Sequence, residues 1–438
     1  MKSERKQLSM EKLIECVRGE FSKIADPAKS SSKYSIRDCL LSGLGMFYLK
    51  SPSLLQFMNS VKVDVASQNL MNLYGVSTVP SDTNFRVRLD EIEYGKRLQY
   101  CFDGLISKLQ RAKILNDFKY YEDYHLVAID GSGYFSSDTI HCDNCCVKEH
   151  KNGMKTYYHQ VLAAVMVCPG IKTVLPLGIE PIIKQDGAKK NDCEINAAKR
   201  LLKTLKTSHP NLKLIFVLDS LYANGPLIKL MNELDFCYII TGKDLTHMYD
   251  EFSYSGKAKS YETNNGGIKR QYKFANELEL NATCTEVKVN YLEYHEIPDI
   301  ETSTKKKFFS SWITNLRLSP DNIYKIMCSG RSRWSIENET FNTLKNLGYN
   351  FEHNYGHGYK KLSVVLCHLM FIAFLIDQIQ AYCGYYFKLA LEKLGTKKYI
   401  WEKIRSVWHM VIVKSWQELY ETVINAYTSK IKFVVASG

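Results

Sequence analysis

The middle of the chain alternates short apolar segments with amphipathic ones, and this alternation narrows the choice of folds. Five apolar runs bounded by turn residues predict β-strands at residues 125–130, 158–168, 173–182, 212–219 and 237–243. Between the later runs, two segments carry apolar residues at helical spacing, at 192–210 and 224–235. The order strand, strand, strand, helix, strand, helix, strand predicts an α/β fold in which helices flank a mixed sheet.

The segments on either side of this core have other patterns. Residues 1–115 repeat apolar positions at helical spacing and predict a helical amino-terminal domain, and residues 116–245 form the first part of the core. Residues 246–316 are polar, rich in Tyr and Lys and partly alternating, which predicts a β-rich insertion. The helical period then resumes, so residues 317–438 are expected to complete the core with a helix and to continue as a helical carboxyl-terminal region.

The composition excludes several classes of protein. With 45% apolar and 24% charged residues, the chain is not disordered. The apolar stretch 364–376 contains His368 and stops at Asp377, so it predicts a buried helix and no membrane crossing. A polar amino terminus and 13 cysteines without framework spacing predict a cytoplasmic, reducing location. Lys and Arg exceed Asp and Glu by 58 − 46 = 12, which favours a polyanionic partner such as nucleic acid.

Two predicted strands end in an aspartate. Asp130 closes one strand before a Gly-Ser-Gly turn, and Asp219 closes another before a turn with Asn, Gly and Pro. If the two strands are parallel neighbours, their carboxyl ends lie side by side, where open α/β sheets bind ligands. The alternative is that each aspartate is only a turn or capping residue.

A third carboxylate lies on a later helix. Arg333 and Glu337 are four residues apart and share a helix face, whereas Glu339 points elsewhere. Because a buried carboxylate needs a cation, Glu337 is expected to pair with Arg333 or with a metal ion. A purely structural pair with Arg333 is the alternative.

These motifs resemble the Asp-Asp-Glu insertion-sequence transposases with a ribonuclease H-like core, most closely insertion-sequence family four and its relatives. The resemblance spans approximately residues 117–358 and is carried by AIDGSGY, FVLDSLYANG and RWSIE followed by FNTLK. It implies that Asp130, Asp219 and Glu337 are catalytic and bind two Mg²⁺ or Mn²⁺ ions, and that Arg333 contacts phosphate. At the position of the family's Tyr, three residues before the Arg, this chain has Gly330.

Two further positions follow from the same resemblance. The family's phosphate-binding Lys lies seven residues after the Glu, where this chain has Leu344. The candidate for that role is Lys345, which would share the Glu337 face only if the helix contains a π-bulge. Trp312 lies about where relatives carry a Trp that stacks on a displaced base. A core position on an alternating strand is the alternative for Trp312.

The resemblance implies a DNA transposase that cleaves element ends and transfers the strands into target DNA by cut-and-paste. Its partner would be double-stranded DNA, bound by the helical amino-terminal domain of residues 1–115 and by a homodimer in the synaptic complex. Its location would be the cytoplasm of a prokaryote, at the nucleoid. Two alternatives remain open. One is a ribonuclease H-like nuclease or resolvase that cuts without joining, and the other is an inactive DNA-binding repressor derived from a transposase.

A second group of metal-ligand residue types lies between the first two predicted strands. Cys142, Cys145, His150 and His159 could enclose a structural Zn²⁺ ion, because a C-x-x-C pair and two histidines supply tetrahedral ligands. The second pair lacks a standard spacing, so reduced cysteines in a hairpin without a metal are the alternative.

Overall fold

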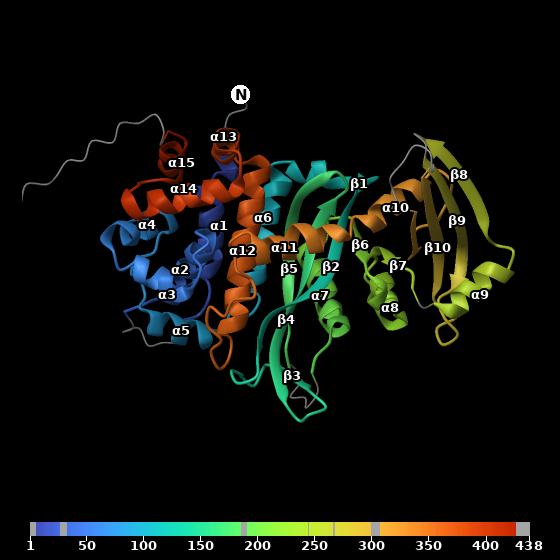
Figure 1. Cartoon of the computed structure of the whole chain (residues 1–438), viewed down its shortest axis with the longest axis horizontal. Coiled ribbons are helices and arrows are strands. Elements are labelled where there is room, and N and C mark those ends of the chain that lie inside the picture. Colours follow the sequence, from blue (N-terminus) through green and yellow to red (C-terminus); the bar gives the residue numbers. More distant parts are fainter. Residues whose placement is uncertain are drawn as a thin grey trace, which may run out of the picture.

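The structure is a computed structural model that describes residues 6–26, 33–184, 191–243, 245–265, 268–298 and 307–425. Figure 1 shows helices from both ends of the chain at one side, a central sheet, and the strands β8 to β10 with helix α9 at the other side. One mixed sheet runs through the centre and continues to β8. The predicted α/β class, with a mixed sheet flanked by helices, is confirmed.

Five of the seven core strands are the predicted ones and follow the predicted order, whereas the short strands β1 and β3 were not predicted. They are β1 (Lys119–Tyr121), β2 (Tyr124–Ser137), β3 (Cys146–Glu149), β4 (Lys155–Cys168), β5 (Ile171–Ile182), β6 (Leu214–Leu218) and β7 (Cys237–Thr241). β4 pairs antiparallel with β2 and β5, whereas β2, β6 and β7 are parallel neighbours. All five residues of β6 are buried, as expected for a central strand covered on both faces. This arrangement is consistent with a ribonuclease H-like core.

Two helices connect the second half of the core. α7 (Glu194–Ser208) precedes β6, and its buried alanines and leucines pack on β4 and β5. α8 (Gly225–Glu233) joins β6 to β7. The side chain of Asn224 caps α8 by accepting the Leu227 N–H at 3.3 Å, and Pro226 lies in the first turn, where no backbone donor is needed. These local signals explain why the helix begins immediately after the β6 turn.

The segment 246–316 contains α9 (Thr246–Tyr254) and the strands β8 (Lys259–Asn265), β9 (Ile268–Glu279), β10 (Lys288–Pro298) and β11 (Phe308–Thr314). β11 pairs antiparallel with β7, so these strands extend the core sheet. The alternating burial along β9 reflects one face packed and one face exposed.

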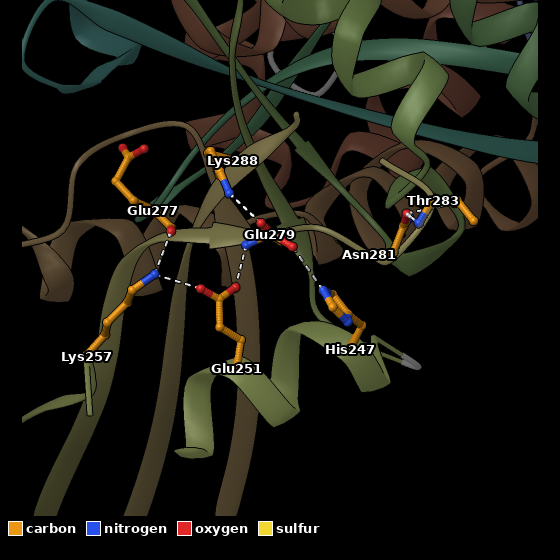
Figure 2. Close-up of polar contacts among 8 residues, drawn as sticks. All are labelled: His247, Glu251, Lys257, Glu277, Glu279, Asn281, Thr283 and Lys288. Carbon is orange, nitrogen blue, oxygen red and sulfur yellow. Dashed lines mark hydrogen bonds and ion pairs between the residues drawn. The ribbon is translucent and has the colours of Figure 1, made fainter. Parts of the chain in front are cut away.

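A polar network fastens α9 to this extension, as Figure 2 shows. The Glu251 carboxylate accepts the backbone N–H of Glu279 at 2.7 Å and a hydrogen bond from Lys257 at 2.6 Å. The Glu279 side chain in turn lies 3.2 Å from His247 and 2.8 Å from Lys288. Because these side chains remain partly exposed to solvent, each ion pair contributes little to stability, and together they hold α9 in position against the strands.

The remaining helices come from the two ends of the chain. The amino-terminal ones are α1 (Met10–Phe21), α2 (Ile36–Tyr48), α3 (Leu54–Ser60), α4 (Asp64–Tyr74), α5 (Asp82–Asp90) and α6 (Arg97–Arg111). The carboxyl-terminal ones are α10 (Ile323–Arg331), a π-helix (Ile336–Phe341), α11 (Asn342–Asn346), α12 (Leu362–Cys383), α13 (Tyr385–Leu394), α14 (Lys397–Met410) and α15 (Trp416–Asn425). Four of the amino-terminal helices begin at a serine whose hydroxyl accepts a backbone N–H, which satisfies a donor that the helix leaves free.

Helices from the two ends pack against each other. The Asn69 amide on α4 donates to the carbonyls of Trp408 at 2.9 Å and Val411 at 2.8 Å. The hydroxyls of Tyr48 and Tyr420 lie 2.9 Å apart in the buried interior. The amino-terminal helices and α12 to α15 therefore form one packed layer beside the sheet (Figure 1).

α12 is the central helix of this layer and packs against α2 and β5. Among the described residues, it is the one helix with the length and apolarity to cross a membrane, but 94% of its most apolar window is buried inside the protein. Its apolar character on all sides is that of a buried core helix. The buried helix predicted from residues 364–376 is therefore present.

Candidate functional site

Asp130 and Asp219 occupy matching positions on neighbouring parallel strands. The register pairs Ala128 of β2 with Val217 of β6, and each aspartate lies two residues further along its own strand direction. Neighbouring strands are about 4.8 Å apart, so the two residues meet at the same edge of the sheet. Asp130 accepts the Gly131 N–H at 2.9 Å, and Asp219 accepts the Leu221 N–H at 2.8 Å and so caps the short helix that follows β6.

Glu337 reaches this edge from the π-helix Ile336–Phe341. Arg333 connects it to the strands, because one guanidinium nitrogen lies 2.8 Å from the Glu337 carboxylate and 3.7 Å from the Asp130 carboxylate. Burial raises the pKa of Asp130 to about 6; the Gly131 hydrogen bond and Arg333 oppose this shift, and the negative charges of Glu337 and Asp219 add to it. The structure thus brings the three carboxylates and Arg333 into one cluster.

A fourth carboxylate, which the sequence analysis did not select, borders this cluster. Glu194 is the first residue of α7, and a Cβ added at Gly131 would lie 2.7 Å from its carboxyl carbon. The Tyr222 hydroxyl donates to Glu194 at 3.4 Å. Burial raises the pKa of Glu194, and the charge of Asp219 adds to this effect. Glycine at position 131 therefore makes room for the acidic side chain beside Asp130.

The helix that carries Glu337 contains a π-turn. A π-turn closes hydrogen bonds between residues five apart and takes one more residue than an α-turn. In a regular α-helix, a residue about seven positions further along returns to the same face. When one of the two turns is a π-turn, this spacing becomes about eight positions. Lys345, eight residues after Glu337, thereby comes to the Glu337 side of the helix. Its ammonium group lies 2.7 Å from Glu352, so it is paired within the chain.

The structure places Trp312 in the core. The side chain is 2% exposed on β11, and its indole fills the space beside Gly330 of α10, where an added Cβ would collide with the ring. Trp312 therefore occupies a core position, which was the alternative for a residue on an alternating strand. Its buried ring is not accessible for the predicted stacking on a displaced base. The same contact leaves no room for a side chain at position 330.

An exposed aromatic residue lies beside the carboxylate cluster at another position. Trp334 follows Arg333 directly in the sequence, and 57% of its surface is exposed. The Arg333 guanidinium lies 5.2 Å from the Trp334 ring centre, within the range of a cation–π contact. A flat ring with an open face next to an Arg side chain is of the kind on which a nucleobase can stack.

A second cluster of metal-ligand types is formed by Cys142, Cys145, His159 and His357. Their ligand atoms all lie within 4.8 Å of one another, so the cluster could bind a metal ion. Three of the four are the residues predicted from the sequence, but His357 takes the place of His150. The His150 ring instead contacts the Thr156 hydroxyl at 2.9 Å at the exposed end of the hairpin. The prediction that His150 belongs to this cluster was wrong, because sequence proximity did not reveal the fourth ligand.

Comparisons with known proteins add little to this geometry. No family model matches the chain, and no curated protein matches it. Among solved structures, the NurA nuclease from Sulfolobus solfataricus is similar with a TM-score of 0.23 and 11% sequence identity, over 52% of this chain and 82% of that chain. At this TM-score the likeness carries no conclusion about function.

Proposed function

We propose that this protein is an Asp-Asp-Glu transposase that cleaves DNA ends and joins them to target DNA. The observation that carries the proposal is the convergence of three carboxylates at one sheet edge: Asp130 and Asp219 share a register across β2 and β6, and Arg333 ties Glu337 to Asp130. This is the arrangement expected from the family resemblance of the sequence.

The donor set fits a site for Mg²⁺ or Mn²⁺. Carboxylate oxygens are the hard ligands these ions prefer, and the raised pKa of Asp130 reflects burial together with nearby negative charge that a cation would neutralise. Asp130, Asp219 and Glu337 are the residues that would hold the ions. Two such ions would activate a water or a 3′-hydroxyl and stabilise the leaving oxygen of an in-line displacement.

The other residues of the cluster have roles on the substrate. Arg333 has donors beyond those facing Glu337 and Asp130, and its planar fork suits a phosphate of the scissile strand. Trp334 offers an exposed ring for a neighbouring base. The excess of 12 positive charges favours binding to DNA, and the joining of two ends calls for a dimer on DNA.

The test uses the full chain and DNA that carries the sequences flanking the coding region on each side. With Mg²⁺, the wild-type protein should cleave this DNA and join the released 3′ ends to a target plasmid. Asp130→Asn, Asp219→Asn and Glu337→Gln should each abolish both steps while leaving DNA binding within about threefold. Glu339→Gln is the matched control on the same helix, and it should behave like the wild type.

Two results would replace the proposal with one of its alternatives. Cleavage without joining would identify a nuclease or resolvase on the same core. Binding to the ends without metal-dependent cleavage by the wild type would identify a repressor. Full activity in Asp219→Asn would overturn the carboxylate assignment itself.

A further inference from the structure

We propose that Cys142, Cys145, His159 and His357 bind one structural Zn²⁺ ion, which fastens the β2–β4 hairpin to the segment that follows the Glu337 helix. This site is separate from the carboxylate cluster, and it would be present whatever reaction the carboxylates perform.

The spacing of the four ligand atoms matches a tetrahedral zinc centre. With Zn–S of about 2.3 Å and Zn–N of about 2.05 Å, a tetrahedron separates two sulfurs by about 3.8 Å, a sulfur and a nitrogen by about 3.6 Å, and two nitrogens by about 3.3 Å. The two Sγ atoms are 3.8 Å apart and the two Nε2 atoms 3.2 Å apart. Three sulfur–nitrogen distances are 3.6, 3.4 and 3.3 Å.

The charge of the proposed ligand set also suits a buried ion. Two thiolates and two neutral imidazoles carry two negative charges, which a divalent zinc ion cancels. Cys145, His159 and His357 are buried, and a neutral complex avoids the large cost of burying a net charge. Because the protein fills all four positions, no open position remains for a reacting water, and the ion would be structural rather than catalytic.

Contacts around the ligands hold them in place. The ring Nδ1–H of His357 donates to the Gly358 carbonyl at 2.7 Å, which directs Nε2 to the cluster. Cys142 and Cys145 lie in one turn, in which the Cys145 N–H donates to the Cys142 carbonyl at 3.1 Å. The Phe135 ring packs 4.3 Å from the His357 ring and 5.8 Å from the His159 ring.

The loop that carries His357 is held to the amino-terminal helices. The carboxylate of Asp90, at the end of α5, accepts the backbone N–H groups of residues 359–362 at 2.9 to 3.0 Å. The amide of Asn144, inside the C-x-x-C turn, donates to the Lys360 carbonyl at 2.8 Å. An open cleft of about 750 Å³ lined in part by Cys142 and His357 gives an ion access from solvent.

The position of His357 gives the ion its structural role. Cys142, Cys145 and His159 come from the hairpin that contains β2, the strand of Asp130, whereas His357 lies between α11 and α12. A row of neighbouring aromatic rings leads from the cluster to the π-helix. The ring centre of Tyr134 lies 5.9 Å from those of His159 and Phe351, and the ring centre of Phe351 lies 6.1 Å from that of Phe341. A bound ion would therefore join the two parts of the chain that carry Asp130 and Glu337.

The test measures metal content and stability of the purified full chain, neither of which requires activity. The wild type, expressed with zinc in the medium and dialysed, should contain one zinc per chain by mass spectrometry. Cys145→Ala and His357→Ala should retain less than a tenth of that content. Cys146→Ala, next to a ligand, and His150→Ala should retain all of it. A strong chelator should lower the Tm of the wild type.

If the ligand variants fail to fold, cobalt exchange in the wild type decides the question. Co²⁺ should replace the zinc and give the visible absorption of a tetrahedral thiolate complex. Absence of stoichiometric zinc in the wild type, or full zinc content in folded His357→Ala, would overturn the proposal. Asp130→Asn and Glu337→Gln should keep their zinc, so a failure of the proposed transposase activity is distinguishable from a failure of this site.

Discussion

Arg333 lies 3.7 Å from the carboxylate of Asp130 and 2.8 Å from that of Glu337, and so holds together two acids from distant parts of the chain. Without a divalent ion, this guanidinium is the positive charge between them. A divalent ion bound between Asp130 and Glu337 would supply the positive charge that the guanidinium provides in this structure.

Replacing Arg333 by Gln should destabilise the protein mainly when metal is absent. We expect the free energy of unfolding at pH 7 to fall by roughly 1–2 kcal/mol, because Asp130 and Glu337 lose their common partner. Saturating Mg²⁺ should restore most of this loss by supplying the missing charge. Urea denaturation with and without Mg²⁺ measures both values. Arg331→Gln, which removes an exposed pair with Glu296, is the control, and an equal loss in Arg333→Gln with and without Mg²⁺ would contradict this role.

A side chain at position 131 is expected to displace Glu194. Gly131→Ala places a Cβ 2.7 Å from the Glu194 carboxyl carbon, which is the far end of a flexible side chain, so Glu194 must turn away and the cost should be about 1 kcal/mol, the low end for overpacking. Gly133→Ala on the same strand is the control, since its Cβ would meet nothing closer than 3.9 Å. Adding Glu194→Ala to Gly131→Ala should recover stability by removing the clash. Thermal unfolding of the wild type, Gly131→Ala, Glu194→Ala and the double variant measures the coupling. Equal stability of Gly131→Ala and Gly133→Ala would refute this explanation.

The exposed and buried tryptophans should respond differently to substitution. Trp334→Ala should weaken DNA binding by roughly 5- to 100-fold with little change in Tm, because one stacked base contributes about 1–3 kcal/mol. Trp312→Ala should lower stability by about 3–5 kcal/mol, since it empties a buried site. Fluorescence anisotropy with labelled DNA measures the first effect, with the exposed Tyr254→Ala as control. Unchanged DNA affinity in Trp334→Ala would remove Trp334 from the proposed DNA contact.

His368 should make stability depend on pH. Burial lowers the pKa of His368 in α12 to about 4 from 6.5, so the unfolded chain binds its proton first as the pH falls. The stabilisation is complete above pH 6.5 and is lost between pH 6.5 and 4. From pH 7.5 to 5 we expect a loss of about 2 kcal/mol from this group. In His368→Leu, the free energy of unfolding should lose this part of its dependence on pH, whereas the exposed His353→Leu should keep it. If the free energy of unfolding falls equally between pH 7.5 and 5 in His368→Leu and in the wild type, the assignment to His368 is contradicted.

The core sheet and its acidic edge were accessible from sequence because their signals are local. Continuous apolar runs ending in Asp130 and Asp219 indicated buried parallel strands, and helical spacing placed Arg333 on the Glu337 face. His357 and Glu194 were missed because only the tertiary fold brings them to the residues they contact. The orientation of Trp312 was undetermined because alternation on a strand does not say which face is buried. The π-turn at residues 336–341 was not predicted, because rules of helical spacing assume a regular α-helix.

The most direct test of the account is Mn²⁺ binding to the full chain, measured by electron paramagnetic resonance of the free ion. The wild type should bind two Mn²⁺ per chain, and Asp130→Asn, Asp219→Asn and Glu337→Gln should each weaken binding at least tenfold, with Glu339→Gln unchanged. Wild-type Mn²⁺ binding in Asp219→Asn would contradict the claim that the three carboxylates hold the metal ions together.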